Sequence, residues 1–161
     1  MRVWVLIVAL LLPNVGGWLS SISVMGQVSR PDGDSWYDTI NKPSWTPPNW
    51  VFGPAWTVFY TMIGFSSYLV YRDGGGFTEK SQFPLTLYLI HLFVNWTWTP
   101  VFFGLHKLGL ALLHIVILDI LAVGCAISFY MVNRWAAGLF LPYIAWSIFA
   151  TCLTATLWHL N

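Results

Sequence analysis

Five long apolar segments constrain this sequence more than any other feature, because each is long enough to cross a bilayer. They cover residues 3–24, 50–71, 82–103, 108–132 and 135–157. A helix of about 20 apolar residues crosses a hydrocarbon core about 30 Å thick. The segments do not alternate apolar and polar residues as the strands of a membrane barrel do. We therefore expect an all-α integral membrane protein, a five-transmembrane-helix bundle that forms a single domain over residues 1–161.

The charge content agrees with a surface that faces lipid. Only 8% of the residues are charged and 57% are hydrophobic, whereas a soluble domain carries about 25% charged residues. The net charge is +1 without a basic run, so we expect no nucleic acid partner. Cys125 and Cys152 lie in apolar runs without metal-ligand spacing, and we expect neither a disulfide nor a metal site from them.

The first apolar segment admits two interpretations. A start with Met1 and Arg2 followed by an apolar run is also typical of a signal peptide. The run continues past Pro13 without an A-x-A cleavage site, which favours a retained helix. Gly16 and Gly17 would let that helix pack closely against a neighbour.

The connection between the first two segments, residues 25–49, is unusual in length and composition. Long connections are usually functional or disordered, and disordered segments lack aromatic residues. An aromatic belt at the membrane interface would explain one or two tryptophans, but it would not explain the prolines, which stiffen the chain. We predict a long structured loop that acts as a lid over the mouth of the bundle. The residues that carry this prediction are Trp36, Tyr37, Pro43, Trp45, Pro47 and Pro48.

Polar and aromatic stripes on the predicted helices indicate a cavity beneath the lid. His91, Asn95 and Trp98 share one face of the third helix, because they lie at i, i+4 and i+7. Asn95 needs a partner, since an unpaired amide in hydrocarbon is costly. Two alternatives stay open: a hydrogen bond to another helix, or a polar handle for a flat, mostly apolar ligand. The second and fifth helices contribute similar stripes, from Trp56, Tyr60, Pro142, Trp146, Ala150 and Leu153.

Three motifs occur in order through nearly the whole chain: WYDTINKPSWTPPNWVFGPAW, NWTWTPVFFG and LPYIAWSIFAT. Together they resemble the TspO/translocator protein family, the tryptophan-rich sensory proteins, also called peripheral-type benzodiazepine receptors. The resemblance implies five transmembrane helices, a homodimer, and binding of porphyrins, synthetic aromatic amides and, in animal members, cholesterol. It implies no required cofactor. The stretch DGGGFTEK looks more like animal members, which implies the mitochondrial outer membrane, with a bacterial membrane as the alternative.

The resemblance also implies a ligand pocket under the first loop. Animal members often carry Trp where this chain has Leu110, and their cholesterol motif is altered here, with Ala155 and His159 at its Tyr and basic positions. By position, the pocket residues would be Ser21, Val24, Phe52, Gly53, Ala55, Trp56, Asn95, Trp98, Leu110, Ile117, Trp146, Ala150 and Leu153.

Two functions from different classes follow. The first is a membrane receptor or transport protein that binds porphyrins and sterol-like lipids without chemistry. The second, proposed for some bacterial members, is a light- and oxygen-dependent porphyrin-degrading enzyme that would use Trp56 and Trp146. No nucleophile–base pair or carboxylate pair is visible, which favours the binding protein. Asp119, alone inside a span, is expected to bond another helix rather than a ligand, because a charge there costs about 2.5–3.5 kcal/mol.

Overall fold

The described part of the chain is built from helices. The computed structural model describes residues 3–28 and 35–161, and within them only helices and their connections occur. The prediction of an all-α fold is thereby confirmed. Residues 29–34 of the predicted lid lie outside the described residues. The long helices are α1 (Val3–Ser23), α4 (Asn49–Asp73), α5 (Glu79–Thr99), α6 (Leu108–Tyr130) and α7 (Arg134–Leu160).

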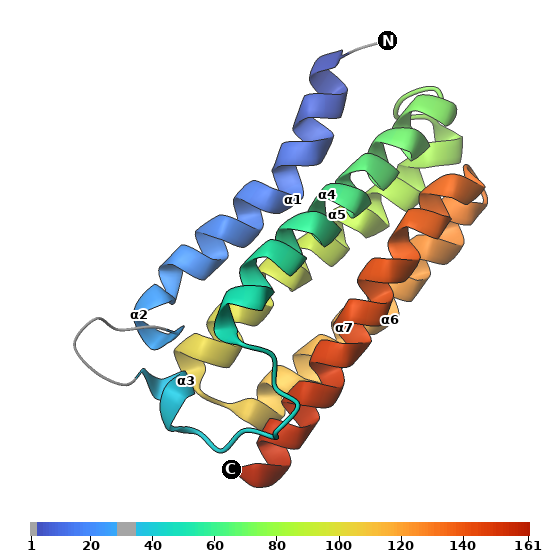
Figure 1. Cartoon of the computed structure of the whole chain (residues 1–161). Helices are drawn as coiled ribbons and strands as arrows, with labels where there is room; N and C mark the ends of the chain where they lie inside the picture. The colour runs from blue at the N-terminus through green and yellow to red at the C-terminus, as the bar shows by residue number, and fades with distance from the viewer. Residues whose placement is uncertain (1–2, 29–34) are drawn as a thin grey trace.

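The long helices lie roughly along one direction, and Figure 1 shows α1 on the outer side of α4, with α6 and α7 on the other side of the bundle. The start of α1 lies at the same end as the α4–α5 and α6–α7 turns. The C-terminus lies at the other end, close to the short helix α3 (Trp36–Thr39). This second end also holds α2 (Met25–Val28) and the aromatic connecting segment.

Three of the long helices, α1, α6 and α7, are long and apolar enough to cross a membrane. Helices α4 and α5 have suitable lengths of 25 and 21 residues, but they carry more polar side chains. Several of these side chains face other helices rather than the outer surface. The Ser66 hydroxyl, for example, donates to the Ala136 carbonyl oxygen at 2.7 Å. A lower mean hydropathy therefore does not exclude α4 and α5 from the interior of a membrane bundle, where polar side chains can bond to other helices.

The helix ends follow the predicted spans closely except at one break. The span predicted as 82–103 is divided at Pro100 into α5 and a π-helix, η1 (Pro100–Gly104). Proline has no N–H to give to the carbonyl four residues earlier, which belongs to Trp96. The Ser20 hydroxyl of α1 donates to this Trp96 carbonyl at 2.5 Å. The break thus supplies a bond between α1 and α5.

Small residues let α1 approach its neighbours closely, as predicted for Gly16 and Gly17. A Cβ added at Gly16 would lie 2.1 Å from the Trp96 ring, and one added at Gly17 would lie 2.3 Å from the Tyr60 ring. Both distances are too short for real atoms, so any larger residue would have to displace these rings. Because α1 is a helix that packs on α4 and α5 in this way, it is an integral part of the bundle.

Candidate functional site

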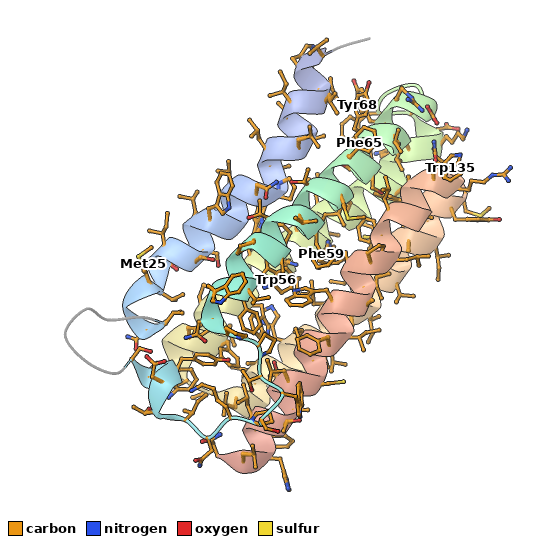
Figure 2. All side chains as sticks on the ribbon, viewed as in Figure 1. Met25, Trp56, Phe59, Phe65, Tyr68 and Trp135 are labelled. Atoms are coloured by element: carbon orange, nitrogen blue, oxygen red, sulfur yellow. The ribbon has the colours of Figure 1, made fainter. Side chains whose placement is uncertain are left out.

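A cavity of about 300 Å³ lies at the end of the bundle that holds α2 and α3. Its volume is at the lower end of the range for small-molecule sites, about 300–1,000 Å³. Side chains from every helix of the described chain contribute to its wall, which is mostly apolar and aromatic. Figure 2 shows Trp56 and Phe59 of α4 among the side chains that fill the space between α4 and α7.

The structure brings most of the predicted pocket residues to the cavity wall. They come from α1, α4, α5 and α7 and from the turn after α1, and they approach one another although they are far apart in the sequence. These residues are Ser21, Val24, Phe52, Gly53, Trp56, Asn95, Trp98, Ala150 and Leu153.

Four predicted residues, Ala55, Leu110, Ile117 and Trp146, do not line the cavity. Leu110 and Ile117 are each 45% exposed, because they lie on the outward face of α6. Trp146 lies behind the wall, where its ring packs against Trp56 at a centroid distance of 6.4 Å. These four residues were predicted from their positions in the family. Their helices do contribute to the cavity, but through other residues.

Helix α6 presents Ile115 and Leu118 to the cavity instead, and these were not predicted. A signal for them exists in the sequence. Ala111, Ile115, Leu118 and Ala122 lie at i, i+4, i+7 and i+11, the spacing of one helix face, and all four are buried. On α7, Leu157 continues the predicted stripe of Ala150 and Leu153 by one turn and also lines the wall.

A buried chain of hydrogen bonds runs from the cavity wall into the interior of the bundle. The Tyr60 hydroxyl donates to Asn95 Oδ1. Asn95 Nδ2 donates to the Tyr143 hydroxyl at 2.7 Å, which lies 2.8 Å from His91 Nε2. These bonds join α4, α5 and α7. The first alternative for Asn95, a hydrogen bond to another helix, is therefore confirmed, and Asn95 and Tyr60 also face the cavity.

The connecting segment, residues 35–48, packs over the end of the cavity. Tyr37 is only 4% exposed and lines the cavity. Trp36 stacks on His106 with a centroid distance of 4.2 Å, and Trp45 meets the Phe149 ring edge-on at 5.8 Å. Pro48 precedes the first turn of α4. The aromatic residues of the segment are thus packed against the bundle.

Polar contacts hold this segment in place. Asp38 accepts hydrogen bonds from the Ser35 hydroxyl and backbone N–H, at 2.7 and 3.1 Å, and the hydroxyl bond is the main cause of the lowered pKa of Asp38. Burial raises the pKa of Tyr37, and the Asp38 carboxylate adds to this effect. At the far end, the Asn41 backbone N–H donates to Asn161 Oδ1 at 2.9 Å, and Asn161 Nδ2 donates to the Asn41 carbonyl at 3.0 Å.

Asp119 has a structural partner on the neighbouring helix, as the sequence favoured. Its carboxylate accepts hydrogen bonds from the hydroxyls of Ser147 at 2.5 Å and Thr151 at 2.7 Å. Both donors belong to α7, and Asp119 belongs to α6. Asp119 does not line the cavity.

The described residues of the cavity wall are mostly apolar. Within residues 3–28 and 35–161, no three His, Cys, Asp or Glu side chains lie close enough to hold a metal ion. Among the described residues, the cavity wall includes no Asp, Glu, Lys, Arg, His or Cys. An apolar site with few polar groups is typical of a pocket that recognises a ligand by shape.

Comparison with known proteins gives a consistent result. Residues 9–159 match the model of the TspO/MBR family. The translocator protein of Homo sapiens is 41% identical over 151 residues, which cover 94% of this chain and 86% of that protein. The Sus scrofa translocator protein is 40% identical over 151 residues with the same coverage. The tryptophan-rich sensory protein of Cereibacter sphaeroides is 35% identical over 136 residues, 84% of this chain and 82% of that protein.

Proposed function

This chain belongs to the TspO/MBR family, and from that membership we propose that it is a membrane receptor or transport protein that binds porphyrins, sterol-like lipids and aromatic amides. All five long helices would cross the membrane, with α4 and α5 shielded by their neighbours. The residues 25–49 connection would act as the lid. Its similarity to animal translocator proteins supports the mitochondrial outer membrane as its location, and a homodimer as its assembly.

The cavity is the observation that carries this proposal. Its wall combines flat aromatic surfaces, from Trp56, Trp98 and Phe102, with the polar pair of Tyr60 and Asn95. Aromatic faces stack on flat conjugated ligands, and the Asn95 amide can pair with a carbonyl or carboxyl group at one edge of such a ligand. No cofactor is required for this kind of recognition.

Filling the cavity tests the proposal. Ala150 lines the cavity and is buried, whereas Ala145 is exposed on the same helix. Purified wild type in nanodiscs, titrated with protoporphyrin IX in the dark, should show saturable quenching of tryptophan fluorescence. The Ala150→Phe variant should lose this quenching, and the control Ala145→Phe should keep it. Equal quenching by both variants would place the porphyrin outside the cavity and overturn the proposal.

The enzyme alternative has one observation in its favour, the edge-on contact between Trp56 and Trp146. Only Trp56 of this pair reaches the cavity wall. Illuminating the porphyrin complex in air decides between the two functions. For a binding protein, the porphyrin absorbance should stay unchanged throughout the illumination. Bleaching to a new pigment in wild type, lost in Trp146→Phe while quenching in the dark persists, would support the enzyme.

A further inference from the structure

The seam between α1 and α4 is closed over several turns. At its tight end, a Cβ added to Gly64 would lie 2.3 Å from the Ala9 carbonyl oxygen. Further along, Asn14 Nδ2 donates to the Thr61 hydroxyl at 3.2 Å. The contact between Gly17 and the Tyr60 ring follows. Up to this level, no gap separates the two helices where they face each other.

The seam opens in the next turn. The final bond across it joins Trp18 Nε1 to Thr57 Oγ1 at 3.4 Å. One turn nearer the start of α4 lies Gly53, where an added Cβ would meet no atom within 4 Å. Gly53 nevertheless lines the cavity. Gly53 is therefore both exposed at the outer surface and part of the cavity wall.

Several side chains line the cavity and reach the outer surface at the same time. Trp18 is 49% exposed and Met25 is 59% exposed, and both line the cavity. Ser21, one turn after Trp18, does the same. Figure 2 shows Met25 on the outer side of the bundle, where α1 is followed by α2. On this side, the same side chains form both the cavity wall and the outer surface.

Other described residues of the cavity wall are tightly packed. Tyr37, Phe102 and Leu157 line the cavity and are each less than 5% exposed. The paired hydrogen bonds between Asn41 and Asn161 fix the connecting segment to the end of α7. A ligand that came from the water above this segment would have to break these contacts.

We propose that ligands reach the cavity sideways from the membrane, through a portal bounded by Trp18, Ser21, Met25, Gly53 and Thr57. This inference rests on the proposed ligand-binding function and specifies its ligand class: amphiphiles dissolved in the interfacial layer of the bilayer. Gly53 lies four residues into α4, about 6 Å along the helix axis. Trp50, which is 75% exposed in the first turn, places this level near the headgroups, where exposed tryptophans prefer to lie.

Narrowing the portal tests the route. The variant is Gly53→Leu, and the matched control is Gly138→Leu, because Gly138 is also an exposed helical glycine with no atom within 4 Å of an added Cβ. The probe is N,N-dibutyl-naphthalene-2-carboxamide, which is neutral and partitions into lipid. Its binding to protein in nanodiscs is followed by stopped-flow quenching of tryptophan fluorescence.

In Gly53→Leu, the association rate and the dissociation rate should both fall, by about tenfold, as expected for a barrier on the path, whereas loss of contacts in the cavity alone would speed dissociation. Gly138→Leu should match wild type. Asn161→Ala removes the hydrogen bonds that fix the connecting segment to the end of α7. This variant should leave both rates unchanged. Wild-type rates in Gly53→Leu, or faster rates in Asn161→Ala, would overturn the lateral route but leave ligand binding intact. Failure of wild type to bind this probe and porphyrin saturably would instead refute the proposed function and the portal with it.

Discussion

Asn95 has a structural role, and we propose that the same amide also recognises the ligand. Both of its polar atoms are bonded to tyrosines on other helices, yet the side chain also faces the cavity. An amide can form up to four hydrogen bonds, so the two bonds to tyrosines leave capacity for a ligand. A bonded amide is also held in one orientation, which makes it a more selective partner than a free one.

Replacing Asn95 should therefore cost stability as well as affinity. Asn95→Leu removes two interhelical bonds and leaves the Tyr60 and Tyr143 hydroxyls with fewer partners. We expect a loss of about 1–3 kcal/mol in unfolding free energy, measured by thermal unfolding in detergent, and weaker binding of amide-bearing ligands. The control Gln82→Leu, an exposed amide on the same helix, should change neither quantity. A thermal midpoint for Asn95→Leu equal to that of the control would contradict the structural role.

The residue stripes show why some site residues could be predicted and others could not. Asn95 and Trp98 have a helical spacing, and Ala150 and Leu153 share a face, so periodicity alone grouped them correctly. Leu110 and Ile117 came from resemblance by position, and α6 is so uniformly apolar that hydropathy does not distinguish its inner face from its outer one. On such a helix, the small residues Ala111 and Ala122 mark the packed face more reliably.

At the scale of the elements, helix length is predictable from hydropathy, but the packing between helices depends on a few small residues. The predicted spans agree with the long helices to within a few residues, except where Pro100 starts the π-helix. Neither the α1–α4 seam nor the bond from Ser20 to Trp96 could be read from the sequence, because both depend on which helices become neighbours.

Gly64 should be the least replaceable glycine of the α1–α4 seam. An added Cβ would meet a backbone oxygen of Ala9, which cannot rotate away as a side chain can. We expect Gly64→Ala to push α1 outward and to cost about 1–3 kcal/mol in unfolding free energy, seen as a lower thermal midpoint. Gly138→Ala, where the Cβ meets open space, should leave the midpoint equal or higher, because alanine favours helix more than glycine does. A Gly64→Ala protein as stable as wild type would show that α1 is not packed as described.

At the scale of the whole molecule, the connecting segment is bonded through Asn41 to Asn161, which is 120 residues further along the sequence. Its aromatic residues pack on η1 and α7, and the Asn161 side chain pairs with the backbone N–H and carbonyl of Asn41. The composition of the segment predicted that it is structured, because prolines and tryptophans together favour an ordered loop. Its attachment to residue 161 could not be predicted, since nothing local relates the two asparagines.

Removing the Asn161 amide should loosen the segment without unfolding the bundle. In Asn161→Ala, backbone hydrogen exchange within residues 36–41 should speed up about thirtyfold, because two hydrogen bonds worth about 1 kcal/mol each are lost. The control is Thr156→Ala, whose hydroxyl bonds only to the Cys152 carbonyl of its own helix. Exchange mass spectrometry compares the two variants, and equal exchange in both would show that the asparagine pair does not hold the segment.

The position of His91 has a consequence for coordination chemistry. His91 Nε2 lies 2.8 Å from the Tyr143 hydroxyl, which also accepts a hydrogen bond from Asn95 Nδ2. The imidazole is fully buried behind these residues and is not among the described residues that line the cavity. It therefore has no nitrogen to offer an iron or zinc ion held in the cavity. Metal-free and metal-containing porphyrins should therefore bind with similar Kd, and the haem complex should lack the visible absorption bands of an axial histidine ligand.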